Sequence, residues 1–392
     1  MKTFERRAVA ALFFLFGFGM ISWVPRFPEI KANLHINNGQ FGTLVSLGAI
    51  GSFLSFLTVG HLVHRFGTGK AMALSAATYS LGVGLIVHST HAWQFLLCNI
   101  SIGAGISAFH ISVNSEIFHM QSKSEELILP RMHGAWSAGS LSTAILSGFL
   151  ASRMTLWIHI DGLIVIVYSL MLILLWKTRH ALLPGNASSN EQTSAKRLFK
   201  AFKVDWIITF SIIFSNLLEL CIGDWSTIFA KEDLHMSPGV SAIPFVVFAS
   251  AMILGRFQVQ RVTPHIAIAD LSKWAAITCG IVFALTTTVG AHIAKSAPTT
   301  GFTIFVVGAF IGGLGSSFLN PTLLNAANKR SIEPGAVVLG RLGLLTTSLT
   351  FLFKTVIAWV AQLTSISVAL LIPSLGLIST TLAIKAIREA NR

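Results

Sequence analysis

The sequence predicts an all-α membrane protein with twelve transmembrane helices in two six-helix bundles. Of its 392 residues, 53% are hydrophobic and only 11% are charged, and the mean hydropathy is +0.72. Soluble domains carry about twice that charged fraction. Apolar runs of about 20 residues, each long enough to cross the hydrocarbon core of a bilayer, recur along the whole chain. We therefore expect most of the chain to lie in lipid.

The twelve predicted spans follow one another with short polar connections. Their approximate limits are 8–25, 40–63, 70–88, 93–118, 132–153, 156–176, 205–228, 240–260, 266–292, 300–323, 335–358 and 364–387. The first span follows the sequence MKTFERR and has no small-residue cleavage site after it. We therefore expect an uncleaved first helix rather than a signal peptide.

The positions of Lys and Arg predict the orientation of these spans. Most of them fall on one side of the membrane, and the exceptions are Arg26, Lys31, Arg153, Lys231 and Lys295. Cytoplasmic loops of membrane proteins carry the excess of positive charge. Both termini are therefore expected in the cytoplasm, which requires an even number of spans.

A polar segment divides the chain into two halves. It contains PGNASSNEQTS, followed by the basic sequence AKRLFKAFK. We predict an N-terminal six-helix bundle over 1–180, a cytoplasmic linker over 181–203 and a C-terminal six-helix bundle over 204–392. The basic part of the linker is expected to lie near anionic lipid rather than to bind a ligand.

The fourth span carries an unusually polar helix face. Gly103, Ser107, His110 and Asn114 follow one another at steps of four, three and four residues, which places them on one side of a helix. Ionisable residues inside a membrane span usually mark a pathway or a binding site. The alternative is close helix packing through small residues.

Several function classes have no support in the sequence. The three cysteines lie far apart without metal-ligand spacing, and no nucleotide-binding loop or catalytic triad is present. The net charge of +13 does not form a basic patch interleaved with aromatic residues, so nucleic acid is not an expected partner. We expect neither an enzyme nor a protein with a cofactor or metal.

The loop after the second span resembles the signature of the major facilitator superfamily, G-x-x-x-D-R-x-G-x-R-R. In the sequence GHLVHRFGTGK, Gly60, Arg65, Gly67 and Lys70 match this pattern, whereas His64 replaces the aspartate. The segments WVPRFPEIK and GDWSTIFAKEDL are similar to an uncharacterised bacterial inner-membrane branch near the fucose-permease group. The resemblance implies a secondary transporter with alternating access, in which the four matching residues serve the conformational change. It also implies that the protein lies in the inner (cytoplasmic) membrane.

Five polar residues are predicted to bind substrate. They are His110, Asn114, Trp136, Asn216 and Asn320. Trp136 offers a ring on which a sugar or heterocycle stacks, although tryptophans near span ends are also common at the membrane interface. Asn320 precedes Pro321, which is expected to interrupt the tenth helix.

Proton coupling and gating are assigned to charged residues in or near the spans. Glu219 and Asp224 are the predicted proton-coupling residues, and the alternative for Glu219 is a bond to a neighbouring helix, for instance to Lys354. Arg26 is expected either to pair with Asp224 when the outer mouth closes or to extend toward the interface.

A second charged group is predicted at the cytoplasmic ends of the helices. Glu116 is expected to form an inner gate or a structural ion pair near Arg131 and His133, and Lys329 or Arg330 are further candidate partners.

The predicted function is proton-coupled uptake of a small, sugar-like polar solute by a monomer in the lipid bilayer. The alternative is a proton-antiport exporter of amphipathic compounds, which the many phenylalanines would suit. A non-transporting membrane sensor is a third hypothesis, and the lack of a sizeable soluble segment argues against it. Substrate-dependent uptake would separate transport from sensing.

Overall fold

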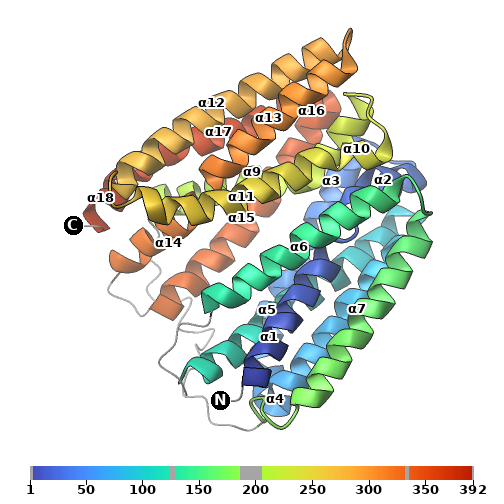
Figure 1. The fold of residues 1–392 in the computed structure, drawn as a ribbon, viewed down its shortest axis with the longest axis vertical. Coiled ribbons are helices and arrows are strands. Elements are labelled where there is room, and N and C mark those ends of the chain that lie inside the picture. The colour runs from blue at the N-terminus through green and yellow to red at the C-terminus, as the bar shows by residue number, and fades with distance from the viewer. Residues whose placement is uncertain (1–2, 123–128, 186–204, 332–334, 391–392) are drawn as a thin grey trace. The chain divides into compact units, whose positions relative to one another are not determined.

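The computed structural model of the chain describes residues 3–122, 129–185, 205–331 and 335–390, and these residues are almost entirely helical (Figure 1). Ten helical segments of this described part are long and apolar enough to cross a membrane. The prediction of an all-α protein with many membrane spans is therefore confirmed.

The chain divides into two compact units. Unit 1 consists of Met1–Ile36 and Leu44–Gln192, and unit 2 consists of Asn37–Thr43 and Thr193–Arg392. The boundary after Gln192 falls inside the predicted linker 181–203. Most of that linker lies outside the described residues, so its structure stays a prediction.

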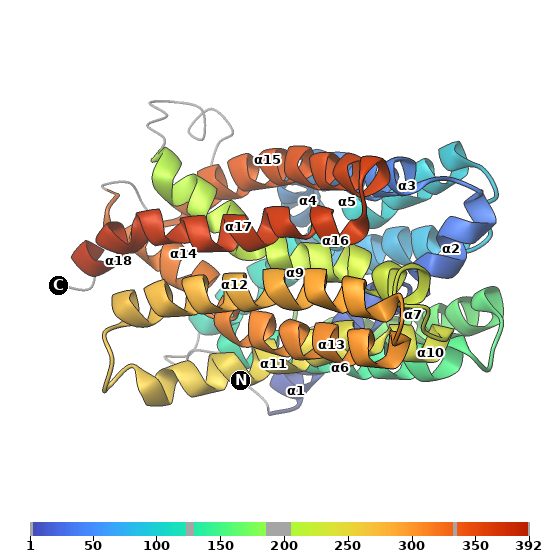
Figure 2. The same ribbon diagram turned by 90° about the horizontal axis from the view of Figure 1, so that it is seen from above.

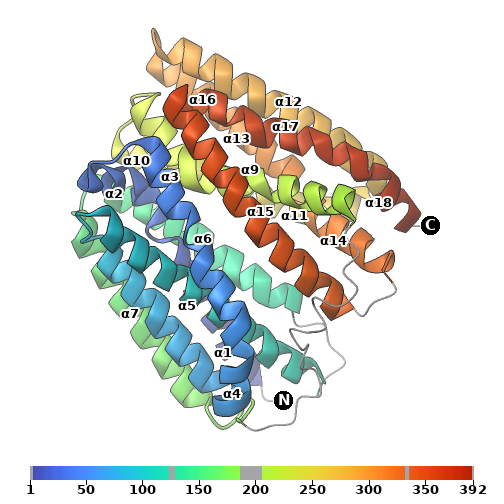
Figure 3. The same cartoon turned by 180° about the vertical axis from the view of Figure 1, so that it is seen from behind.

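Unit 1 is built around two groups of helices. Its elements are α1 (Thr3–Ile21), η1 (Val24–Arg26), α2 (Phe27–Leu34), α4 (Ala49–Ile86), α5 (Ala92–Ser122), α6 (Leu129–Ala151) and α7 (Leu156–Thr178), together with the end of α3 (Asn38–Ser46). Helix α5 lies along α4, and α1 lies along α6 (Figures 1 and 3). Helix α7 contacts both α4 and α1, so it joins the two groups.

Helix α4 contains a break at Gly67. The segment Asn38–Ile86 is a candidate span of 49 residues, which at 1.5 Å per residue is about 74 Å long, more than twice the hydrocarbon thickness. Gly67 has φ 82° and ψ 164°, a conformation that is almost exclusive to glycine. The predicted spans 40–63 and 70–88 lie on either side of this residue.

Unit 2 is arranged around α9. Its elements are α9 (Trp206–Glu232), α10 (Pro238–Ser241), α11 (Ile243–Val262), α12 (Ile268–Ala294), α13 (Pro298–Ser316), α14 (Leu319–Lys329), α15 (Gly335–Leu363), α16 (Ile366–Ala369), α17 (Leu371–Ser379), η2 (Thr380–Ala383) and α18 (Ile384–Ala390). Helix α9 contacts α11, α14, α15 and α17. Helix α12 lies along α13 (Figure 2).

The outward faces of both units are apolar. Leu81 and Trp176 in unit 1, and Phe257 and Leu363 in unit 2, each expose more than half of their surface. A large exposed apolar surface is unfavourable in water but suits a lipid environment. The polar groups described below are therefore exceptions on helices that otherwise face lipid or a packed core.

Candidate functional site

An imidazole and aromatic cluster lies inside unit 1, where α1, α5 and α6 meet. The ring of His110 on α5 lies 5.0 Å from Phe16 on α1, 6.5 Å from His133 and 6.3 Å from Trp136, the latter two on α6. Phe13 on α1 packs edge-on against His133 at 5.7 Å. The structure thus brings together two of the predicted substrate-binding residues, His110 and Trp136.

Two polar atoms in this part of unit 1 are buried without a partner. The Oδ1 atom of Asn114, four residues after His110 on α5, and the Nε1 atom of Trp136 have no hydrogen bond to the described residues. A buried donor or acceptor left unpaired costs about 1–3 kcal/mol. Oδ1 of Asn114 accepts and Nε1 of Trp136 donates, and a hydroxyl group is able to bond to either kind of atom.

The polar face predicted on the fourth span has a mixed role. A side chain at Gly103 would collide with the carbonyl oxygen of Gly48, and the hydroxyl of Ser52 donates to the carbonyl of Gly103 at 3.2 Å. Gly103 therefore permits close packing of α5 on α4, as the packing alternative expected. The residues of this face that packing at Gly103 does not explain are Ser107, His110 and Asn114.

Unit 2 contains a helix break at the predicted position. Helix α13 ends at Ser316 and α14 begins at Leu319, which separates the predicted span 300–323 into two parts. Pro321 has no N–H group and cannot bond to the carbonyl of Ser317, four residues earlier. That carbonyl instead accepts a hydrogen bond from Nε of Arg256 at 3.2 Å. The break thus leaves a backbone group that an arginine from α11 satisfies.

Several predicted site residues lie near or on these unit 2 helices. The Oδ1 atom of Asn320, beside the break, is buried and has no hydrogen-bond partner among the described residues. Glu219 on α9 is half-buried and forms no hydrogen bond or ion pair within the described part of the chain, although the positive charge of Arg256 acts on it. Asn216, one turn earlier, is also half-buried.

Asp224, the second predicted proton-coupling residue, has a firm partner. Its carboxylate lies 2.7 Å from Nζ of Lys354 on α15, and both side chains are about five-sixths buried. The alternative in which Lys354 pairs with Glu219 is wrong, because Lys354 pairs with Asp224, five residues farther along α9.

Arg26 is also paired inside its own unit. Its guanidinium forms two bonds of 2.7 Å to the carboxylate of Glu29, contacts Nδ1 of His159 at 3.1 Å and donates to the carbonyl of Met154 at 3.0 Å. The side chain is fully buried, so the alternative in which Arg26 extends to the interface is wrong. The predicted pair of Arg26 with Asp224 stays a prediction, and each residue already has a counter-charge.

Glu116 lies at the end of α5, and it is held by neutral groups. Its Oε2 atom accepts hydrogen bonds from the hydroxyl of Thr68 and from the backbone N–H of Leu183 at 2.9 Å. Glu116 has no ion pair with the described residues of its own unit, and the ion pair with Arg131, Lys329 or Arg330 stays a prediction. Arg330 pairs with Glu389 and Asp205, and Lys329 donates to the carbonyl of Ala390. The side chain of Arg131 lies outside the described residues.

In the loop that matches the superfamily signature, Gly67 and Gly60 have different surroundings. A Cβ atom at Gly67 would lie 2.6 Å from the carbonyl oxygen of Leu183, whereas one at Gly60 would meet nothing within 4 Å. Arg65 is exposed and lies over the ring of Phe66 at 5.2 Å, and Lys70 is exposed. Gly67 is therefore the position at which the backbone requires glycine.

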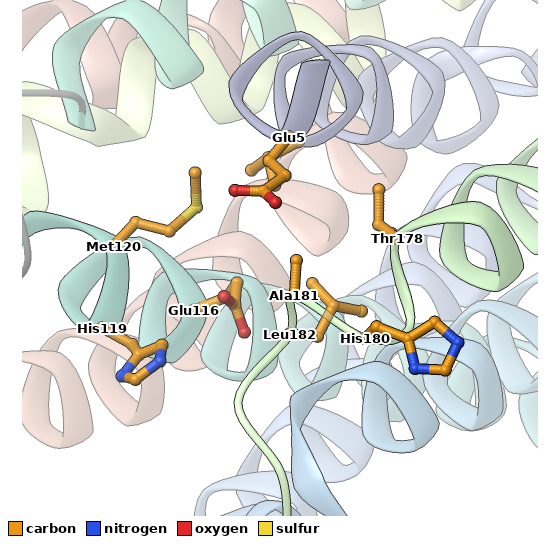
Figure 4. Close-up of a pocket in the computed structure, with 9 residues that line it drawn as sticks. Glu5, Glu116, His119, Met120, Thr178, His180, Ala181 and Leu182 are labelled. Atoms are coloured by element: carbon orange, nitrogen blue, oxygen red, sulfur yellow. The ribbon is translucent and has the colours of Figure 1, made fainter. Parts of the chain in front are cut away.

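A cavity of about 250 Å³ lies elsewhere in unit 1, lined by Glu5, Glu116, His119 and His180, among others (Figure 4). None of the five predicted substrate-binding residues lines it.

Sequence reasoning missed three contributors to these regions. Arg256 is not among the predicted site residues, although it lies in an apolar helical run, which is the signal for a functional cation. Glu29 lies three residues after Arg26, a spacing that favours an ion pair on a helix. Phe16 is one of many phenylalanines, and no sequence signal separates it from the others.

The sequence profile described as Major Facilitator Superfamily matches residues 9–340. An uncharacterised MFS-type transporter of Yersinia pestis is 26% identical over 379 residues, which cover 96% of this chain and 94% of that protein. The membrane protein MosC of Rhizobium meliloti is 22% identical over 67% of this chain and 62% of its own length.

Solved structures show the same fold. A mutant form of the nucleoside transporter NupG gives a TM-score of 0.76 at 15% identity and covers 98% of this chain and 99% of its own. A D-xylose–proton symporter gives a TM-score of 0.70 at 13% identity, covering 97% and 96%. The similarity to the fucose-permease branch is not supported by these relatives beyond the shared superfamily.

Proposed function

Because the chain belongs to the Major Facilitator Superfamily, we propose that it carries a small, sugar-like polar solute into the cell by proton-coupled alternating access. Two unpartnered buried atoms carry this proposal: Nε1 of Trp136, whose ring lies 6.3 Å from that of His110, and Oδ1 of Asn114, four residues after His110 on α5. A hydroxyl group of the solute donates to Asn114, and another accepts from Trp136.

The chemistry of the cluster suits a ring-shaped solute with several hydroxyl groups. The C–H face of a sugar packs against the indole of Trp136, while the hydroxyls replace the hydrogen bonds that the two buried atoms lack. Two of the proteins with a similar fold are a nucleoside transporter and a D-xylose–proton symporter, whose substrates contain a sugar ring. This likeness supports the same substrate class for the present chain.

Glu219 is the proposed carrier of the coupling proton. A carboxyl group that has no fixed hydrogen-bond partner gains and loses a proton without breaking other bonds. Asp224, in contrast, is held by Lys354 at 2.7 Å, so its proposed role is to keep α9 and α15 together rather than to exchange protons.

We further propose twelve spans with both termini in the cytoplasm of the cell and a monomer in the inner membrane. The 49-residue segment Asn38–Ile86 counts as two spans because of the break at Gly67, and α6 adds a helix of 23 residues to the ten candidates. The positive-inside rule then supports cytoplasmic termini.

A thermal-shift screen of the purified full-length protein tests the proposal. A ligand that binds only the folded state raises Tm in a concentration-dependent way. We expect a shift with a hydroxylated solute such as a pentose, hexose or nucleoside. Replacing Trp136 by Phe keeps a ring but removes the N–H donor, and it should weaken binding about tenfold.

The matched control is Trp157→Phe, because Trp157 is half-exposed on α7 and lies outside the cluster. An unchanged shift in Trp136→Phe would contradict the proposed site. Shifts only with amphipathic compounds would contradict sugar-like uptake and favour export.

A further inference from the structure

A cavity in unit 1 has an acidic lining that the proposed transport does not use. It lies where the start of α1 meets the ends of α5 and α7, and its volume is about 250 Å³ (Figure 4). Glu5 faces it from α1, and Glu116 lies on the opposite side, on α5. The imidazoles of His119 and His180 also line it, the remaining side chains are apolar or hydroxylic, and no Lys or Arg contributes to it.

Both carboxylates of the cavity lack a counter-ion among the described residues. Glu116 is only 1% exposed, and the two hydrogen bonds that it accepts both reach Oε2, from neutral donors. Its Oε1 atom accepts no hydrogen bond from the described residues. Glu5 has no hydrogen bond or ion pair with any described residue. A buried carboxylate without a cation is unfavourable, because its lost hydration is not replaced.

Several other carboxylates of the described residues have a basic partner. Lys and Arg together number 28 against 15 Asp and Glu, so cations are in excess. Glu29, Asp161, Asp224 and Asp270 each pair with a basic side chain at 2.7–2.8 Å. Glu5 and Glu116 have no such ion pair with a described residue, in contrast to these four carboxylates.

The size and lining of the cavity indicate which cation would fit. At about 30 Å³ for each water molecule, the volume corresponds to about eight waters, which suits a small organic molecule. Among the described residues, no group of three or more His, Cys, Asp or Glu is arranged to hold a metal ion. Val9, Met120 and Leu182 add buried apolar walls.

We propose that this cavity binds a small aliphatic amine in its ammonium form. The ammonium group donates a hydrogen bond to Oε1 of Glu116. Glu5 supplies a second negative charge, which attracts the same ammonium group or, in a diamine, the other one. The methylene chain packs against Val9, Met120 and Leu182. The site is separate from the His110 cluster, so the proposal of amine binding does not depend on the proposed transport.

The test is a thermal-shift titration of the full-length protein with 1,4-diaminobutane. The diamine should raise Tm, whereas the neutral isostere 1,4-butanediol and equal concentrations of sodium chloride should not. Glu5→Gln removes one negative charge at a position with no partner to lose among the described residues, so it should weaken binding of the diamine about tenfold or more. Glu116→Gln should do the same, since an amide oxygen still accepts from Thr68 and Leu183.

The matched control is Glu389→Gln, which removes a negative charge on α18 in unit 2. It should leave the shift caused by the diamine unchanged. No shift in the wild type, or a full shift in Glu5→Gln, would overturn the proposal even if Glu116→Gln fails to fold. Any shift caused by a sugar-like solute should persist in Glu5→Gln, which separates this test from that of transport.

A lipid headgroup is a second source of an ammonium group. The titration is therefore repeated in nanodiscs of phosphatidylglycerol alone and with added phosphatidylethanolamine. Loss of the diamine shift only with the aminolipid would identify a lipid headgroup as the occupant of the same ammonium site. An equal shift in both membranes would identify the free amine.

Discussion

Polar side chains in the two units differ in how many of their hydrogen-bond and ion-pair partners the protein itself supplies. Arg26 has two carboxylate bonds, an imidazole contact and a backbone acceptor, and Asp224 has an ammonium partner. Asn114 and Asn320 each keep a buried oxygen without a partner among the described residues. A satisfied group gains little from a ligand, whereas an unpaired group gains a full hydrogen bond. This difference is the residue-scale basis for assigning binding to the asparagines and structure to the ion pairs.

Replacement of Glu219 by Gln tests whether this residue is needed for coupling to protons but not for movement of the solute across the membrane. The amide keeps the shape of the side chain but carries no exchangeable charge. We expect loss of uptake driven by a pH gradient, with exchange of labelled for unlabelled solute retained, as measured in proteoliposomes. Glu389→Gln, on an exposed helix, should retain both activities. Gradient-driven accumulation by Glu219→Gln would show that another group carries the proton.

Replacement of Asp224 by Asn tests the structural role of its ion pair. The change leaves Lys354 with its charge largely buried and without a carboxylate, a situation that is strongly destabilising. We expect a lower Tm, and partial recovery in the double variant Asp224→Asn with Lys354→Met. If Asp224→Asn kept the wild-type Tm but lost pH-driven uptake, Asp224 rather than Glu219 would be the coupling residue.

At the scale of elements, the two helix breaks arise from different local chemistry. Pro321 removes a backbone donor, so the break in the tenth predicted span was visible in the sequence. The break at Gly67 depends on a backbone conformation that the motif alone does not reveal, because Gly60 matches the same motif and lies in open space. The segment after α7 passes over Gly67, and Thr68 N–H donates to the carbonyl of Leu183 at 3.1 Å.

The pair of variants Gly67→Ala and Gly60→Ala measures this difference directly. Alanine at Gly67 must adopt a conformation that costs about 1–3 kcal/mol and would also meet the carbonyl of Leu183. We expect a lower Tm for Gly67→Ala and an unchanged or slightly raised Tm for Gly60→Ala in the same detergent. Equal stability of the two variants would mean that the segment after α7 does not pack on Gly67 as described.

At the scale of the whole molecule, composition was enough to predict an all-α membrane protein, since apolar length and low charge leave few alternatives. The site was predicted only in part. The sequence indicates His110 and Trp136 because polar groups are costly on a membrane-spanning helix and usually serve a function there. Folding places their rings 6.3 Å apart. The partners of Arg26 and Glu116 were not predictable in full, because His159 and Leu183 lie far away in sequence and are brought near only by folding.

The central claim, proton-coupled uptake through the His110 and Trp136 cluster, is tested most directly in proteoliposomes. The protein is reconstituted into vesicles with an inwardly directed proton gradient, so that the outside is more acidic. Entry of a labelled solute identified by the thermal-shift screen is then measured. We predict accumulation above the external concentration, abolished by collapsing the gradient and strongly reduced in Trp136→Phe but not in Trp157→Phe. Solute entry at the same rate with and without the proton gradient would contradict proton coupling. Accumulation that is unchanged in Trp136→Phe would contradict the proposed binding site.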